Sequence, residues 1–253
     1  MEQKKQVYVV GIGPGAYEEM TIRATKVLEA CDTIIGYTVY VYVDLVREHF
    51  PEKRFLTTPM TQEVRRCEMA FEEADKGQVT AMICSGDAGV YGMAGLMYEI
   101  QKEKGWEEIK ITVVPGITAA SAGAARLGAP LIHDFAVISL SDLLTPWEKI
   151  EERLRMAAKG DFAICLYNPS SRKRKDYLKR ACRILLEYKR EDTICGYVRQ
   201  IAREGEKKQI LTLGELKDTT TDMFTTVFIG NSQTKRIEDV MVTPRGYRYE
   251  KNH

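Results

Sequence analysis

In the first half of the chain, short apolar runs alternate with segments of helical periodicity. The apolar, β-branched runs predict strands at Gln6–Ile12, Thr33–Tyr37, Gln78–Cys84 and Ile109–Val114. Between them, apolar positions spaced by three or four predict helices at Met20–Ala30, Val39–His49, Thr61–Lys76 and Gly92–Lys104. Strands separated by helices imply crossover connections, so this half predicts a mainly parallel sheet covered on both faces.

The second half has a different rhythm, in which strands follow one another with fewer helices. Helices are expected at Thr118–Leu127, Trp147–Lys159 and Arg172–Lys189, and strands at Ala136–Leu140, Asp161–Tyr167, Thr193–Val198, Gln209–Leu213 and Thr225–Ile229. This order favours a mixed sheet. The sequence therefore predicts an α/β protein with two domains, 1–120 and 121–253, whose boundary lies within 116–133 without a flexible linker.

Composition narrows the class of protein. The 253 residues are 44% hydrophobic and 29% charged, with 37 basic and 36 acidic side chains, which argues against disorder and against a dedicated nucleic-acid binder. Residues 1–130 carry a net charge of −4 and residues 131–253 a net charge of +5, so the second half suits a carboxylate-rich partner.

No targeting or membrane segment is apparent. The apolar stretch Val7–Gly13 is too short for a signal peptide or a membrane span. The six cysteines lie at least 13 residues apart, so no close-spaced metal or redox pair is present and no metal site is expected. We expect a cytoplasmic protein with reduced, mostly buried thiols and no membrane or nucleic-acid partner.

A glycine-rich loop, Gly11–Gly15, follows the first strand in the position of a dinucleotide-binding loop. The spacing differs from G-x-G-x-x-G, because the third glycine comes one position early. Pro14 lacks the N–H that a phosphate would need, and no acidic residue follows Tyr37 to bind a ribose. A nucleotide-dependent oxidoreductase thus stays only as an alternative, and the loop predicts a tight turn with close backbone approach.

Two further clusters, Ser85–Gly92 and Val114–Ala120, also follow predicted strands. Ligands in open α/β sheets bind outside the carboxyl ends of the strands, so three such clusters predict a small-molecule site. Asp87 supplies a carboxylate there, whose alternative role is to cap a helix.

These clusters, in this order and spacing, resemble the tetrapyrrole methyltransferases that use S-adenosylmethionine. Longer segments resemble the branch that methylates C-17 of precorrin-3B or cobalt-factor III in cobalamin biosynthesis: Val90–Gly95, Leu127–Trp147, Leu166–Ser171, Asp222–Thr225 and Met241–Tyr247. The resemblance covers essentially the whole chain. One departure is Ala88, where proline is more usual.

The resemblance implies two α/β domains with a cleft between them, a homodimer, and S-adenosylmethionine as the methyl donor. The cofactor contacts it implies are Pro14, Gly86, Asp87, Val90, Thr118, Ala119, Asn168, Val198 and Thr225. The N-terminal domain would hold the tetrapyrrole cleft and part of the cofactor site, and the C-terminal domain the rest. Asn168 departs from the methionine common in related branches. Cobalt would enter only as part of the substrate.

The chemistry demands little from the protein, because a sulfonium methyl donor is already activated and the tetrapyrrole carbon is itself nucleophilic. Positioning and exclusion of water are the main requirements. Proton transfer and ring contraction remain, and the candidate catalytic residues are Asp87, His133, Ser139 and Asp142, with Ser141 in the same polar cluster. His133 is a candidate general acid or base, or an axial ligand to substrate cobalt, or makes only a structural hydrogen bond.

Basic residues are expected to hold the acetate and propionate groups of the substrate. The run Arg172–Lys175 is the first candidate, because a basic first turn is unfavourable for a helix unless it has another use. Arg172 and Lys173 are therefore assigned to substrate binding, together with Gly13 and Gly15 at the floor of the cleft. Arg126, Arg199 and Arg245 are further candidates. Within the family, methylation of another ring carbon is the main alternative, and a non-catalytic tetrapyrrole carrier is a third.

Overall fold

The computed structural model describes residues 5–37, 40–171 and 173–247. The chain divides into two compact units, Met1–Thr118 and Ala119–His253.

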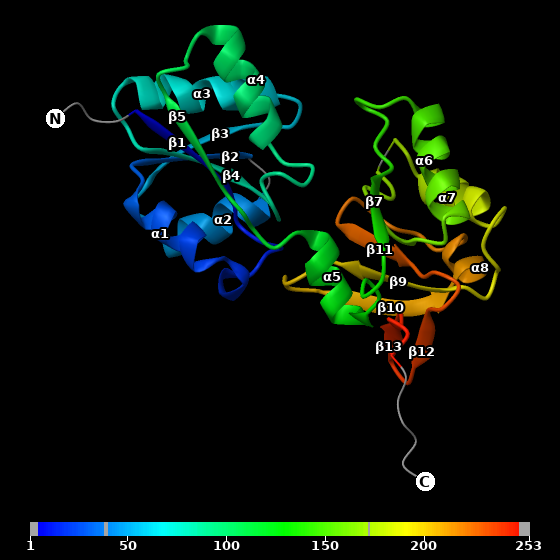
Figure 1. The fold of residues 1–253 in the computed structure, drawn as a ribbon. Helices are drawn as coiled ribbons and strands as arrows, with labels where there is room; N and C mark the ends of the chain where they lie inside the picture. The colour runs from blue at the N-terminus through cyan, green and yellow to red at the C-terminus, as the bar shows by residue number, and fades with distance from the viewer. Residues whose placement is uncertain (1–4, 38–39, 172, 248–253) are drawn as a thin grey trace. The chain divides into compact units, whose positions relative to one another are not determined.

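The first unit is built on a five-stranded parallel sheet (Figure 1). Its strands are β1 (Gln6–Gly11), β2 (Thr33–Tyr37), β3 (Arg54–Thr58), β4 (Thr80–Cys84) and β5 (Lys110–Val114), in the order β3-β2-β4-β1-β5. All neighbouring pairs are parallel, so the prediction of a parallel sheet is confirmed. The edge strand β3 was not anticipated from the sequence, since polar residues surround its short apolar pair Phe55 and Leu56.

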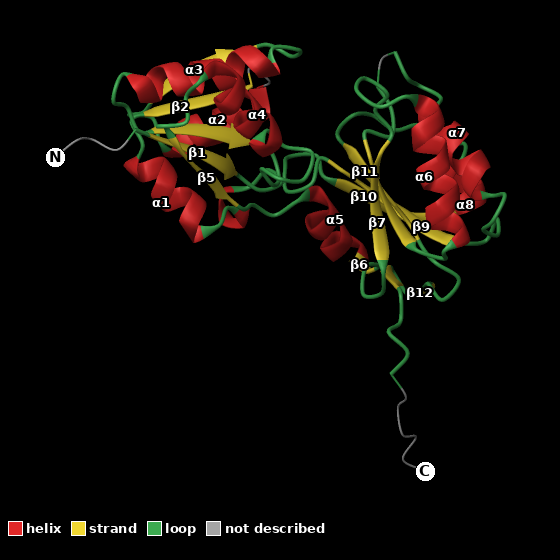
Figure 2. Ribbon diagram, turned by 45° about the horizontal axis from the view of Figure 1, so that its top comes forward, coloured by secondary structure: helices red, strands yellow, loops and turns green. Residues whose placement is uncertain are grey.

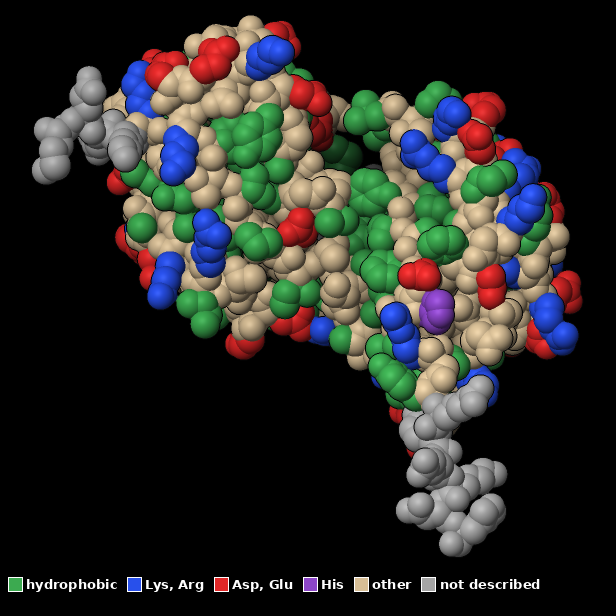
Figure 3. Space-filling view, viewed as in Figure 1, with side chains coloured by type: hydrophobic (Ala, Val, Ile, Leu, Met, Phe, Trp, Pro, Cys, Tyr) green, Lys and Arg blue, Asp and Glu red, His purple; other side chains and the backbone are tan. Residues whose placement is uncertain are grey.

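Helices cover both faces of this sheet (Figure 2). α3 (Glu63–Asp75) and α4 (Ala94–Lys104) pack on one face, and α1 (Ile22–Ala30) and α2 (Tyr40–His49) on the other. A 3-10 turn, Tyr17–Glu19, precedes α1. Charged side chains of both signs are interspersed on the face of the unit seen in Figure 3. On α3 and α4, Lys104 pairs with Glu68 at 3.1 Å.

The second unit has a mixed five-stranded sheet, as expected. Its strands are β7 (Phe135–Ser139), β8 (Ala163–Tyr167), β9 (Ile194–Arg199), β10 (Lys207–Thr212) and β11 (Thr225–Ile229), in the order β10-β9-β11-β8-β7. Strands β7 and β8 are parallel, and the other neighbouring pairs are antiparallel. As a result, the ends of β7, β8 and β9 and the beginning of β11 meet at one edge of this sheet.

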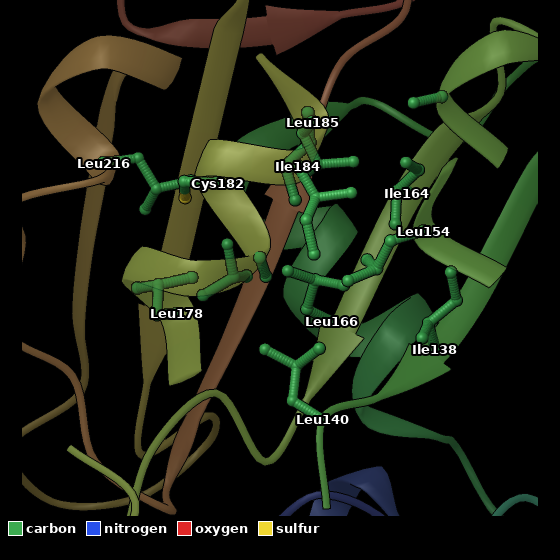
Figure 4. Close-up of a cluster of buried hydrophobic side chains, with 14 of the residues drawn as sticks. Ile138, Leu140, Leu154, Ile164, Leu166, Leu178, Cys182, Ile184, Leu185 and Leu216 are labelled. Carbon is green, nitrogen blue, oxygen red and sulfur yellow. The ribbon is translucent and has the colours of Figure 1, made fainter. Parts of the chain in front are cut away.

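Three helices pack on one face of the mixed sheet and one on the other. α6 (Trp147–Lys159), α7 (Tyr177–Leu185) and α8 (Leu213–Leu216) form a core with the sheet that includes Leu154, Leu166 and Leu185, labelled in Figure 4. On the opposite face lies α5 (Ala119–Leu127), whose small residues allow close packing against Phe228. A small third sheet follows the order β12 (Lys235–Ile237), β13 (Val240–Val242) and β6 (Gly128–Ala129).

The helix expected at Arg172–Lys189 is shorter, because α7 begins at Tyr177 and ends at Leu185. Ser171 and Arg174 instead exchange backbone hydrogen bonds of 3.2 and 3.1 Å in a turn. The basic run therefore precedes the helix, and the argument from an unfavourable basic first turn was wrong. Arg172 itself lies outside the described residues.

Among the described residues, no helix is long and apolar enough to cross a membrane.

Candidate active site

The three glycine-rich clusters follow three adjacent strands. β1 lies between β4 and β5, and the three strands are parallel, so Gly11–Gly15, Ser85–Gly92 and Pro115–Thr118 begin at the same edge of the sheet. We call these segments the loop edge. The carboxyl edge of a parallel sheet is the usual place for a ligand, and here the sequence alone identified the loops.

Backbone contacts join the three segments of the loop edge. Gly13 and Gly86 form an antiparallel bridge, in which the Gly13 N–H donates to Gly86 O at 3.0 Å and the Gly86 N–H to Gly13 O at 2.7 Å. A Cβ on Gly116 would lie 2.1 Å from Gly86 O and 2.6 Å from the carbonyl carbon of Gly11. These glycines are therefore required because main chain lies against main chain.

The carboxylate of Asp87 connects two segments of the loop edge. Oδ1 accepts the N–H groups of Gly89 (2.7 Å) and Val90 (3.1 Å), and Oδ2 accepts the N–H of Gly116 (2.9 Å). The helix cap considered from the sequence is not its role, because α4 begins seven residues later and its N-cap is Met93. Through these three hydrogen bonds to backbone N–H groups, Asp87 holds its own loop and the loop that contains Gly116 in place.

The other N-terminal residues assigned to ligands differ in exposure. Pro14, Gly13 and Gly86 are buried, whereas Gly15 and Thr118 are half-buried and Val90 is exposed. Val90 and Thr118 thus offer side-chain surface at the loop edge.

The C-terminal unit presents a second cluster, which is built from side chains. Asn168 follows β8 with a positive φ of 53°, and its Nδ2 donates to Ser139 Oγ at 2.9 Å. The Ser141 N–H donates to the same oxygen at 3.2 Å. Since Ser139 ends β7, the parallel pair β7–β8 brings these three residues together, and Asn168 is exposed there.

Thr225 begins β11 at the same edge of the mixed sheet, but its side chain is buried. Its Oγ1 donates to Asp222 Oδ1 at 2.8 Å, and Arg199 Nε donates to Asp222 Oδ2 at 2.6 Å. Burial raises the pKa of Asp222, but the bonds from Arg199 and Thr225 outweigh it and hold that pKa below the usual carboxyl range. Arg199, a candidate for binding the substrate carboxylates, therefore pairs with Asp222, an acid of its own unit.

Val198 and Ala119 occupy the other face of the mixed sheet. Val198 is 0% exposed and lies in β9 between two hydrogen-bonded neighbours, so its predicted cofactor contact finds no accessible atom here. Ala119 is half-buried at the beginning of α5, where the next N–H, that of Ala120, donates to the Tyr167 hydroxyl at 2.8 Å. No pattern in the sequence indicated this role of Tyr167.

Asp142 lies in a separate ionic group. Arg174 Nε approaches its Oδ1 at 2.5 Å, and the Tyr177 hydroxyl donates to its Oδ2 at 2.6 Å. The bond from Tyr177, followed by the charge of Arg174, holds the pKa of Asp142 below its usual range. Asp142 therefore joins the segment after β7 to the basic turn after β8, in which Lys173 is exposed.

His133 does not belong to the cluster of Ser139, Ser141 and Asn168. It precedes β7 whereas Ser139 ends it, so on the order of 15–20 Å of strand separates them. Its exposed ring accepts the N–H of Asp134 at Nδ1, 2.8 Å away. The polar group expected from His133 to Asp142 is thus divided between opposite ends of one strand.

The six cysteines are free and buried. Burial raises the pKa of Cys84, the last residue of β4, to about 11, so this thiol is a poor nucleophile near neutral pH. Among the described residues, no group of three or more His, Cys, Asp or Glu side chains is placed to hold a metal ion. A groove lined by residues of α1 with Tyr8 and Val79 contains none of the predicted site residues.

Comparison with known proteins decides the family. The sequence profile of the tetrapyrrole (corrin/porphyrin) methylases matches residues 6–217. The chain belongs to this family. The resemblance drawn from the glycine clusters and the longer motifs is therefore confirmed, and the structure of this methylase has the expected α/β class.

Several relatives of this tetrapyrrole methylase carry more specific names. The probable cobalt-factor III C(17)-methyltransferase of Salmonella typhimurium is 44% identical, over 94% of this chain and 98% of that protein. The precorrin-3B C(17)-methyltransferase of a Sinorhizobium species is 36% identical, over 95% and 96%. The cobalt-factor III methyltransferase of Priestia megaterium is 44% identical, but this chain spans only 46% of its length.

A solved structure is also closely similar. The methyltransferase CobJ superposes with a TM-score of 0.85 at 35% identity, covering 94% of this chain and 99% of that one. A cobalt precorrin-4 methyltransferase, at 22% identity and a TM-score of 0.74, shares the fold.

Proposed function

We propose that this methylase transfers a methyl group from S-adenosylmethionine to C-17 of precorrin-3B or cobalt-factor III, coupled to ring contraction, in cobalamin biosynthesis. The observation that carries the proposal is similarity over nearly the full length of two relatives named for C-17 methylation. A different ring carbon is the alternative, because the same fold occurs in a methyltransferase named for another precorrin.

The loop edge fits a cofactor without phosphate. The N–H groups of Gly13, Gly86 and Gly116 are already bound to Gly86 O, Gly13 O and Asp87 Oδ2, and Pro14 has none to offer. A pyrophosphate needs such groups free, so the arrangement disfavours a dinucleotide. The methionine and adenosine parts of S-adenosylmethionine carry no phosphate and place no such demand on the loop.

The protein's share of the chemistry is to bind and orient. S-adenosylmethionine, when bound, supplies an activated methyl group whose bond to sulfur is exchanged for a bond to the ring carbon. The loop edge would hold the methionine and adenosine parts, with Val90 and Thr118 as its accessible surface, and Ala119 at the beginning of α5 is a further cofactor contact in this proposal. Asn168 would hold the same ligand from the C-terminal unit, with its side chain kept in place by Ser139.

The proposal also assigns Lys173 to the substrate, because it is exposed beside the turn that Asp142 fixes through Arg174. A cationic side chain there suits the acetate and propionate groups of a tetrapyrrole. The expected homodimer and cytoplasmic location stay predictions.

Two measurements test the proposed function. In calorimetry we expect S-adenosylhomocysteine to bind in the micromolar range and NADH not to bind. In an anaerobic assay with cobalt-factor III and a donor labelled in its methyl group, we expect the label at C-17, read by NMR. Lack of S-adenosylhomocysteine binding contradicts the cofactor assignment, and label on another carbon contradicts the C-17 assignment while keeping the family. A parallel assay with metal-free precorrin-3B decides between the two substrates.

A further inference from the structure

Three charged side chains of the described residues are buried, and one of them lacks a counter-charge. Glu73 is held by Arg54 (2.5 Å) and Lys76 (2.8 Å), and Lys189 lies 3.6 Å from Asp161. Arg66 is 5% exposed, yet within the described parts of the chain no carboxylate lies within ion-pair distance of it. Its positive charge is therefore the exception that needs an explanation.

The position of Arg66 is at the carboxyl edge of the parallel sheet. It lies in the first turns of α3, which follows the end of β3, and its guanidinium stacks 5.3 Å from the ring centre of Tyr37, the last residue of β2. The segments of the loop edge follow β4, β1 and β5 at this same carboxyl edge of the sheet. The guanidinium also adds to the field that acts on the Cys84 thiol at the end of β4.

The hydrogen bonds of Arg66 position its guanidinium without neutralising it. Nε donates to Thr58 Oγ1 at 2.9 Å and Nη2 donates to Pro59 O at 3.1 Å, so both acceptors are neutral. Within the described chain, Nη1 makes no hydrogen bond. A buried ion is expensive unless it is paired, and a planar guanidinium is the side chain best shaped to bind a carboxylate.

We propose that Arg66 binds a peripheral carboxylate of the tetrapyrrole. This inference rests on the proposed function and adds a substrate-binding residue in the N-terminal unit, where the sequence predicted only Gly13 and Gly15. Two exposed apolar side chains precede it in sequence, Met60 (48%) and Val64 (51%), and suit the apolar edge of a macrocycle. Arg66 lies at the ends of β2 and β3, apart from the loops assigned to the cofactor, which favours a substrate carboxylate over that of methionine.

The test compares Arg66→Met with Arg65→Met. Arg65 is the adjacent residue on α3, is half exposed and pairs with Glu72, so it controls for loss of a cation from the same helix. For Arg66→Met we expect the KM for cobalt-factor III to rise about 10–100-fold, the value for loss of a charged hydrogen bond. We expect kcat and the Kd of S-adenosylhomocysteine to stay within about twofold. For Arg65→Met, all three should stay within about twofold.

A second variant, Arg66→Lys, keeps the charge without the planar fork and should give an intermediate KM while preserving the fold. An unchanged KM in both Arg66 variants overturns the inference. Weaker S-adenosylhomocysteine binding at unchanged KM also overturns it, because the carboxylate bound by Arg66 would then belong to the cofactor. Loss of both thermal stability and S-adenosylhomocysteine binding in both variants overturns it as well, because Arg66 would then be a structural residue. If the wild-type protein binds no S-adenosylhomocysteine and methylates nothing, the proposed function fails first and this inference with it.

Discussion

The loop edge of the N-terminal sheet and the cluster of Ser139, Ser141 and Asn168 in the C-terminal sheet both hold loops in place at the ends of strands, but by different contacts. In the first, main chain contacts main chain, and the glycines leave no room for a side chain. In the second, side chains such as Asn168 and Ser139 bind one another across neighbouring strands. The loop edge is held together because its glycines have no side chain, whereas the C-terminal cluster is held together by side-chain hydrogen bonds.

This difference predicts different responses to substitution. Backbone atoms in close contact cannot move independently, so one added methyl group disturbs all three segments of the loop edge. A side-chain hydrogen bond at an exposed edge can be lost locally, because water replaces part of it. We therefore expect large effects on the N-terminal unit and graded effects on the C-terminal unit.

The largest effect is expected for Gly116→Ala. Its Cβ would lie 2.1 Å from Gly86 O, so the loops must separate, and we expect a loss of about 3 kcal/mol or more in the stability of the N-terminal unit. Thermal unfolding measures this loss, and calorimetry should show no S-adenosylhomocysteine binding. Gly95→Ala is the matched control, because Gly95 is exposed in α4 with nothing within 4 Å of an added Cβ. It should gain about 0.5–1 kcal/mol. If Gly116→Ala keeps the stability and the S-adenosylhomocysteine binding of the wild type, the loop edge does not depend on close contact between main-chain atoms.

An intermediate effect is expected for Asp87→Asn. The amide keeps one acceptor oxygen but turns an NH2 group toward an N–H that the carboxylate now binds. We expect a loss of about 1–3 kcal/mol in stability and weaker S-adenosylhomocysteine binding by about 10-fold or more. Asp75→Asn is the control, since Asp75 is half exposed and pairs with Lys5 at the surface. Loss of kcat with unchanged S-adenosylhomocysteine binding would instead favour a direct role of Asp87 in the reaction.

The smallest effect is expected for Asp142→Asn, and it should depend on pH. The Tyr177 hydroxyl and then Arg174 lower the pKa of Asp142, so its contribution is complete above the ordinary carboxyl pKa of about 4 and disappears as the pH falls through the lowered value. We expect the variant to melt up to about 4 °C below wild type at pH 7 and the difference to shrink as the pH falls below the ordinary carboxyl range. A difference that stays constant over this range would show that the charge of Asp142 is not what joins the two segments.

Much of the fold was readable from local pattern. The apolar runs and their terminal glycines predicted β1, β2, β4 and β5, because a buried parallel strand needs an apolar run and a glycine-rich turn is needed where backbones meet. The edge strand β3 escaped, since one side of an edge strand faces solvent and its sequence carries little signal. The beginning of α7 was misplaced because Arg174 is bound by Asp142, 32 positions away, which no local pattern reveals.

The sequence by itself determined the class of fold, the three glycine loops and the family, because backbone geometry at a tight approach permits only glycine. Only the tertiary structure decided what the polar residues do. It placed Asp87 across two loops, separated His133 from Ser139 and paired Arg199 with Asp222. It also left Arg66 buried with no acidic partner among the residues that the structure describes. The physical reason is that a polar side chain takes its role from whichever partners the fold brings near, and those partners come from distant strands.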